Sequence, residues 1–223
     1  MWRHFARRQT ALLPTPLGWL CLLLLVLAPP MFWWFCGEAF LSETRRAPAD
    51  VLVVESWIGL EGIRAAGSEF VRGGYRYIAT TGGYTGRHWS QQHTGYSEIA
   101  RRELIQLGIA GERIISAPDV DADHQRTYTA AVTVWRQLRS NGIQAKALNV
   151  FTIGAHARRS RLVFAKVFGS ETDVGAIAWN PPDFGAEPWW RSSYRAGEFI
   201  KETVGYTFEA LLNSGRMSNS PAG

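Results

Sequence analysis

The sequence predicts an α/β protein in which a Rossmann-like, doubly wound parallel sheet of about five strands follows one N-terminal transmembrane helix. Three observations support this fold class. A long uncharged apolar segment stands near the start of the chain. Beyond it, short apolar runs alternate with amphipathic stretches, which is typical of a parallel sheet covered on both faces. The length of 223 residues suits one core rather than two.

The N-terminal apolar segment meets the requirements for a membrane span. No charged residue occurs between Arg8 and Glu38, and residues 17–37 supply the roughly 20 apolar residues needed to cross about 30 Å of hydrocarbon. Pro29 and Pro30 predict a kink near the exit of this helix. A cleavable signal peptide is the alternative interpretation, and the long apolar core favours an uncleaved anchor.

Positive charge sets the predicted orientation of the anchor. Arg3, Arg7 and Arg8 precede it with no acid among them, so the positive-inside rule keeps the N-terminus in the cytoplasm and sends the rest across. The predicted organisation is a cytoplasmic N-terminus (1–16), an anchor that contacts membrane lipids (17–37), a linker (38–48), an α/β domain (49–212) and a flexible tail (213–223).

Composition excludes several classes of function. Both cysteines, Cys21 and Cys36, lie in the anchor, so the domain has neither a thiol nucleophile nor a cysteine-based zinc site. The net charge of +5 includes no dense basic run interleaved with aromatics, so a nucleic-acid partner is not expected.

Strand and helix patterns then alternate to the end of the domain. The run from Asp50 to Glu55 is almost entirely apolar, as in a strand buried on both faces. Strands are predicted at 50–55, 75–80, 113–116, 147–153 and 174–179, and helices at 60–72, 94–107, 125–139, 157–168 and 187–212. Ligands of such sheets bind beyond the carboxyl ends of the strands. The loops after residues 55, 80, 116 and 153 are therefore expected to form the site.

The loop after the fourth strand carries the strongest chemical pattern. His156 stands just before a predicted helix, and Arg158 and Arg159 lie in its first turn. Free amides at a helix start and arginine donors can together hold a phosphate or carboxylate. His156 is then a candidate general acid or base. A solvated arginine face with His156 as a cap is the alternative, and both interpretations remain open.

Two further candidates follow the second strand. Thr81, Gly82 and Gly83 form a turn that lets backbone approach a ligand closely, although it matches neither the dinucleotide fingerprint nor the P-loop. Glu98 falls in the first turn of the next helix, where it could orient His156 or a ligand hydroxyl. An ordinary acid at a helix N-terminus is the alternative for Glu98.

A metal site is not predicted. The acidic loop Asp119–His124 has the density of a calcium loop, but His124 occupies the glycine position and Ala130 the position of the bidentate glutamate. A solvated acidic loop is the favoured interpretation. No cofactor can be named.

Trp189 and Trp190 open the last predicted helix. Packing on the sheet is the favoured interpretation. Contact with the membrane interface is the alternative.

In combination, these landmarks resemble the YdcF/SanA/ElyC-like proteins of bacterial envelopes, a domain of unknown function, over roughly residues 48 to 210. The matching residues are Ala49-Asp50, Thr81-Gly82-Gly83, Ser97-Glu98-Ile-Ala100, Gly108-Ile109, Arg113-Ile114-Ile115, Arg126-Thr127 and Thr152 through Arg159. The chain departs from the family at Glu55-Ser56-Trp57, where a glycine-rich end is usual, and at Arg126, where the family has asparagine. Both departures fall where a ligand would bind.

The resemblance implies a Rossmann-like domain outside the inner membrane of a bacterium and a role in envelope biogenesis, with peptidoglycan or its lipid-linked precursors as expected substrates. The resulting hypothesis is a pocket for an anionic, phosphorylated small molecule or lipid-linked glycan precursor. It uses Thr81, Gly82, Gly83, Thr127, Arg158 and Arg159 for binding, and His156 and Glu98 for any phosphoryl hydrolysis or transfer. A non-enzymatic membrane scaffold or ligand sensor is the alternative function.

Overall fold

The computed structural model describes residues 14–83, 95–118, 125–185 and 187–212. It divides into two units, Met1–Gly37 and Glu38–Gly223. The acidic loop at 119–124 lies outside the described residues, as does Thr94 at the predicted start of the second domain helix.

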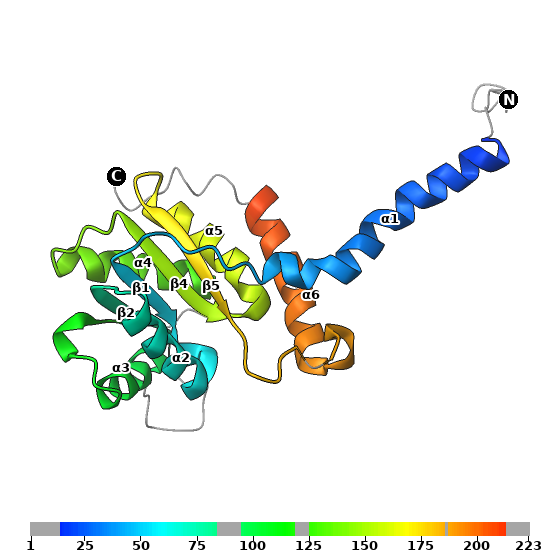
Figure 1. The fold of residues 1–223 in the computed structure, drawn as a ribbon. Helices are drawn as coiled ribbons and strands as arrows, with labels where there is room; N and C mark the ends of the chain where they lie inside the picture. Colours follow the sequence, from blue (N-terminus) through cyan, green and yellow to red (C-terminus); the bar gives the residue numbers. More distant parts are fainter. Residues whose placement is uncertain (1–13, 84–94, 119–124, 186, 213–223) are drawn as a thin grey trace, which may run out of the picture. The chain divides into compact units, whose positions relative to one another are not determined.

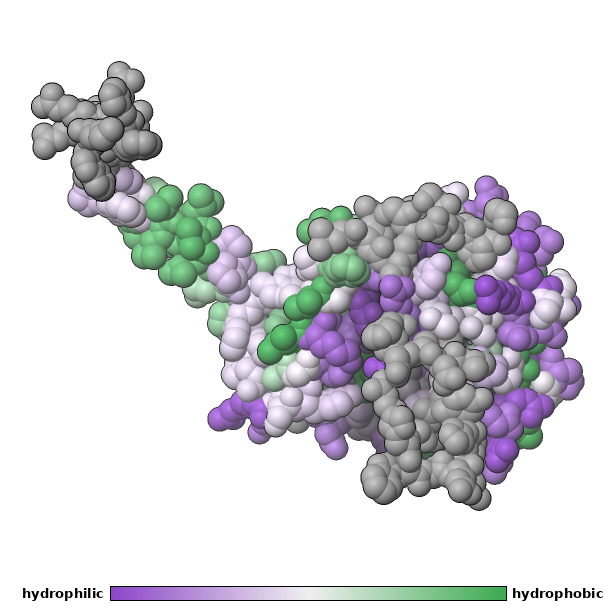
Figure 2. All heavy atoms as spheres, turned by 180° about the vertical axis from the view of Figure 1, so that it is seen from behind, coloured by the Kyte–Doolittle hydropathy of each residue, from purple (hydrophilic) through white to green (hydrophobic). Residues whose placement is uncertain are grey.

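The first unit contains most of α1 (Pro16–Leu41), a helix that continues unbroken through Pro29 and Pro30. It is long and apolar enough to cross a membrane, and most of its apolar side chains are exposed. Figure 2 shows these apolar residues in green along the helix. One spanning-length helix near the N-terminus is thus confirmed.

The second unit is built on five parallel strands in the order β3-β2-β1-β4-β5 (Figure 1). Their bounds are β1 (Val51–Glu55), β2 (Tyr77–Thr81), β3 (Ile114–Ala117), β4 (Ala147–Ile153) and β5 (Asp173–Trp179). The doubly wound parallel class is confirmed. Because the chain moves outward from β1 to β3 and then returns to β4, the sheet has its topological switch point between β1 and β4.

Helices cover both faces of the sheet. The elements are α2 (Gly59–Arg72), α3 (Tyr96–Gln106), α4 (Arg126–Ser140), α5 (Ala157–Phe168) and α6 (Ser193–Thr207), joined by short 3-10 turns η1 (Ser56–Ile58), η2 (Gly111–Arg113), η3 (Gly154–His156) and η4 (Trp189–Arg191) and ended by the π-helical η5 (Phe208–Leu212). Helices α2 and α3 share a core cluster on one face of the sheet, and α4 and α5 share one on the other.

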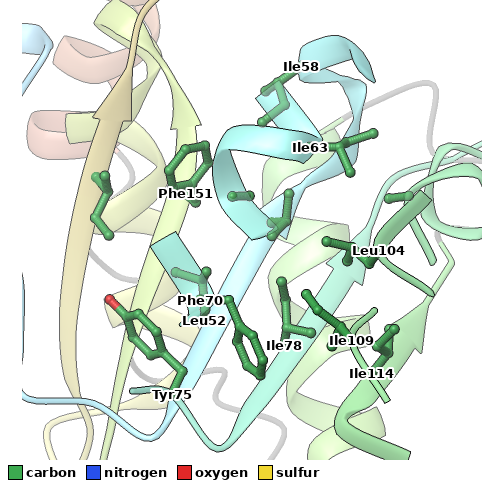
Figure 3. Packing of buried hydrophobic residues seen from close by; sticks show 14 residues of the cluster. Leu52, Ile58, Ile63, Phe70, Tyr75, Ile78, Leu104, Ile109, Ile114 and Phe151 are labelled. Atoms are coloured by element: carbon green, nitrogen blue, oxygen red, sulfur yellow. The ribbon is translucent and has the colours of Figure 1, made fainter. Parts of the chain in front are cut away.

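Alternate strand residues divide between these two clusters. Leu52, Ile78 and Phe151 pack with Ile63 and Phe70 of α2, as Figure 3 shows. Their strand neighbours, such as Val53, face α4 and α5. Burial on both faces explains why the strand sequences contain few polar residues.

The segment predicted as a linker (38–48) is packed on the domain. Arg45 and Ala176 exchange backbone hydrogen bonds of 2.8 Å, which adds an antiparallel bridge to the edge strand β5. The Asn149 amide bonds both the N–H and the C=O of Ala47 at 2.8 Å. Leu41 is fully buried. Residues from Glu38 onward therefore belong structurally to the domain.

The last helix is shorter than the predicted span of 187–212. The Ser192 hydroxyl accepts a hydrogen bond from the Arg195 amide and starts α6 there. The preceding η4 turn carries Trp189, which is buried against Phe199 of α6 at a ring distance of 4.3 Å. Trp189 therefore packs on α6, whereas Trp190 is 43% exposed.

Substitution of Gly175 tests the packing of residues 44–47 on β5. A Cβ there would lie 1.9 Å from Asn149 Oδ1 and 2.5 Å from the Arg45 carbonyl. We expect Gly175→Ala to lower the free energy of unfolding by about 3 kcal/mol, because crowded backbone cannot move away cheaply. Gly197→Ala is the matched control, since Gly197 has open space around it and alanine favours a helix by up to about 1 kcal/mol. Urea unfolding measures both, and equal effects would contradict the docking.

Candidate functional site

The candidate site lies at the switch point, where β1 and β4 end side by side. Glu55 is the last residue of β1, and η3 follows β4 and leads into α5. Glu55 pairs in register with Thr81 of β2. Because Val54 pairs with Phe151, the next β4 residue, Thr152, stands beside Glu55 on its other side. Strand alternation directs this row toward α4 and α5.

His156 is held between two carboxylates. It is 5% exposed and sits directly before α5. Its Nδ1 lies 2.9 Å from Glu202 Oε1, and its Nε2 lies 3.4 Å from Glu55 Oε2. Trp57 covers the ring edge-on, with the centroids 5.0 Å apart. Two acids from opposite ends of the domain therefore meet on one imidazole.

Arg159, in the first turn of α5, completes the cluster. Its Nε and Nη2 donate to the two carboxylate oxygens of Glu202 at 2.6 and 3.0 Å, and its Nη1 donates to Thr127 Oγ1 at 3.2 Å. Every nitrogen of the guanidinium is thus engaged within the protein. The hydroxyl of Ser160 donates to Glu55 at 2.7 Å.

The cluster is electrically balanced. Burial by itself would lower the pKa of His156, but the charges of Glu55 and Glu202 outweigh burial and raise that pKa to about 9. Burial likewise opposes ionisation of both acids, yet His156 keeps the pKa of Glu55 and of Glu202 below the usual range. At neutral pH the imidazolium and guanidinium therefore offset two carboxylates.

Three unpaired polar atoms surround Glu55. Of the four buried side-chain atoms without a hydrogen bond among the described residues, one is Ser42 Oγ, and the others are Thr81 Oγ1, Thr152 Oγ1 and His156 Nε2. Thr152 helps to lower the pKa of Glu55, and Nε2 attracts it by charge, but neither contact has hydrogen-bond geometry. Unpaired buried polar atoms are uncommon in folded proteins, and three of the four stand beside Glu55.

Four helices begin at this edge of the sheet. The residues preceding α2, α3, α4 and α5 make no side-chain cap, in contrast to Ser192 before α6. Uncapped amides and the helix dipoles give this edge a positive potential.

The structure brings some of the predicted residues together and separates others. His156, Arg159 and Thr127 are in contact, and Thr81 joins them through Glu55. Gly82 has φ +134, and a Cβ there would lie 3.0 Å from Tyr96 Cβ, so this turn favours glycine. The carbonyl of Gly83 accepts from the Tyr96 amide at 2.9 Å, which ties the turn to the start of α3.

Glu98 and Arg158 have other partners. Glu98 accepts from Arg102 at 2.9 Å, so the carboxylate that orients His156 is Glu202. Arg158 lies over the Phe40 ring at 3.7 Å and pairs with Glu43 at 3.4 Å. It therefore fastens the segment entering the domain.

Sequence reasoning missed Glu55 and Glu202 as members of the site. A charged residue closing a wholly buried strand was an available signal for Glu55. Local sequence holds no comparable signal for Glu202, which lies 46 residues beyond His156.

Comparisons with protein-family models, curated proteins and solved structures found no match to this chain. Within the described residues, no group of three His, Cys, Asp or Glu side chains is arranged to hold a metal ion.

The unpaired Thr81 hydroxyl makes a prediction about stability. Thr80 and Thr81 are both buried, but Thr80 Oγ1 is hydrogen-bonded to Ser97 at 3.0 Å. We expect Thr81→Val to leave the free energy of unfolding unchanged or raise it by about 1 kcal/mol, because no hydrogen bond is lost. Thr80→Val, the matched control, should lower it by about 1 to 2 kcal/mol. Urea unfolding compares the two, and equal losses would show that Thr81 has a partner.

The raised pKa of His156 makes a prediction about pH. Its folded pKa is about 9 against an ordinary value of 6.5, so its stabilisation is complete below pH 6.5 and is lost as pH rises toward 9. This loss is on the order of 3 kcal/mol. Urea unfolding from pH 6 to 10 measures it. Glu55→Gln removes one carboxylate and should move the loss to lower pH. An unchanged midpoint in that variant would contradict the assignment.

Proposed function

We propose that this chain is a membrane-anchored envelope-biogenesis factor whose α/β domain binds a phosphorylated compound at the carboxyl edge of its sheet. The observation that carries the proposal is the set of unpaired polar atoms around Glu55 and His156, ringed by uncapped helix starts. The resemblance to bacterial envelope proteins, and an N-terminal helix of spanning length with Arg3, Arg7 and Arg8 before it, support the location.

The charges of the cluster imply different positions for the phosphate and for the neutral part of the ligand. Because the Arg159 guanidinium already binds Glu202 and Thr127, we expect a phosphate to be held by the helix starts and the Gly82–Gly83 turn. The Glu55 carboxylate would repel that phosphate. A hydroxyl suits the inner position better, since it can accept from His156 Nε2–H and donate to Glu55. A hydroxyl-bearing phosphate, such as a glycosyl phosphate, meets both requirements.

If the domain turns over its ligand, His156 acts as the acid. Its imidazolium form at neutral pH can supply the Nε2 proton to a leaving oxygen in phosphoryl hydrolysis or transfer. Glu202 and Arg159 then serve as positioning residues, because their contacts hold the imidazole.

A non-enzymatic scaffold is the second candidate, and one observation favours it. The four charged groups satisfy one another almost completely, as they would if the cluster only fastened α6 to the sheet. Substitutions of His156 do not distinguish well between the two functions, because removing a buried charge also destabilises the fold.

The Thr81→Val variant distinguishes ligand binding from a scaffold function, since that variant is expected to fold normally. We expect a glycosyl phosphate to raise the melting temperature of the full-length protein in detergent, because a ligand at 100 times its Kd stabilises by about 2.7 kcal/mol. Thr81→Val should lose most of that shift. Inorganic phosphate and the unphosphorylated sugar test each half of the ligand.

The full chain is needed for this measurement, because residues 41–47 are packed into the domain. No shift with any glycosyl phosphate, or an equal shift in Thr81→Val, would contradict the proposed site and leave the scaffold function.

A further inference from the structure

Helix α6 and the η5 segment that follows it bury two acids and expose an apolar stripe, although they also bury Phe199. Glu202 and Glu209 point inward and are 0% and 8% exposed. On the outward side, Ile200, Val204 and Leu211 are 60%, 65% and 70% exposed. A surface helix normally buries its apolar stripe and exposes its acids.

The inward acids explain how the reversal is maintained. Glu202 is bound by His156 and Arg159, and Glu209 accepts from Lys166 at 3.1 Å. These buried ion pairs fix the rotation of the helix, because turning it would take the acids away from His156, Arg159 and Lys166.

The outward face forms a continuous apolar stripe. Its residues recur every three or four positions and are Gly197, Ile200, Val204, Phe208 and Leu211. Figure 2 shows a diagonal band of apolar residues where α6 crosses the surface. A contiguous exposed stripe of this kind marks a contact surface.

The chemistry around the stripe fits a lipid surface. Tyr194 and Trp190, which are 59% and 43% exposed, flank its N-terminal end, and such aromatics favour the headgroup level. Lys201 adds a half-exposed cation, and the neighbouring acid Glu198 is already paired with it at 2.8 Å. Exposed apolar and aromatic side chains with a lysine beside them suit a lipid interface.

The chain itself brings α6 to the end of the spanning-length segment. Arg195 donates to both oxygens of Glu38 at 3.0 and 2.6 Å, and Tyr206 meets the Phe40 ring at 5.7 Å. Glu38 directly follows the apolar segment. If that segment spans a bilayer, Glu38 and Phe40 hold the inward face of α6 close to the point where the chain leaves it.

We infer that the outward stripe of α6 lies in the interface of an anionic lipid bilayer as a second membrane contact. This inference rests on the membrane anchor of the proposed function and is independent of the proposed ligand. It gives the domain a fixed surface against the membrane rather than a single point of attachment.

Single-cysteine variants of the full chain test it. Ile200→Cys and Val204→Cys, each with both native cysteines replaced by serine, carry an environment-sensitive fluorophore in phosphatidylcholine–phosphatidylglycerol vesicles containing brominated lipid. Val71→Cys is the matched control, because Val71 is an exposed apolar residue (73%) on α2. We expect quenching at positions 200 and 204 to exceed that at position 71 at least about twofold.

A label at native Cys21 reports on the anchor separately. If a fluorophore on Cys21 is not quenched by brominated lipid, the membrane anchor itself is contradicted. If Cys21 is quenched while positions 200 and 204 remain at the Val71 level, only the α6 contact is overturned. Fluorescence at 200 and 204 that changes with protein density instead of brominated lipid would identify a second copy as the occupant and would also overturn it.

Discussion

The domain depends on one balance of buried charge, in which the His156 imidazolium stands between Glu55 and Glu202 and Arg159 closes the network. Burying any of these groups singly would cost several kcal/mol. Their mutual neutralisation therefore obliges the end of β1, the start of α5 and the middle of α6 to meet. The same contacts position His156 at the switch point and decide which side of α6 faces outward.

The sheet could be predicted from the sequence because strands buried on both faces have nearly continuous apolar sequences, as in residues 50–55. The neighbourhood of His156 was also predictable, since the ends of parallel strands converge, whereas Thr127 was expected only from the family resemblance. The partner of His156 was not predictable, because it depends on how a distant helix is rotated. Ordinary amphipathic reasoning would place Ile200 and Val204 inside, whereas the buried ion pairs reverse that choice. Arg158 and Arg159, neighbours in α5, face different parts of the domain because successive helical residues project about 100° apart.

The balanced cluster also limits what the site can contribute to binding. Engaged cations supply geometry rather than net attraction, so the attraction for an anion has to come from helix ends, and selectivity from the hydroxyl and imidazole groups around Glu55. The proposed site would favour ligands that combine a charged and a neutral polar group over bare anions, which the glutamate repels.

The contacts of the entering segment constrain the order in which the chain can fold. The Thr44 hydroxyl accepts from the Ala178 amide, 134 residues later, and Glu38 pairs with Arg195 at a separation of 157 residues. During synthesis, residues 38–47 must therefore wait until β5 and α6 have emerged. Closing such long loops is slow, and Glu38 stays apart from its partner Arg195 until it happens. A prematurely terminated chain lacking α6 is thus expected to be a substrate for proteolytic quality control rather than a partly working protein.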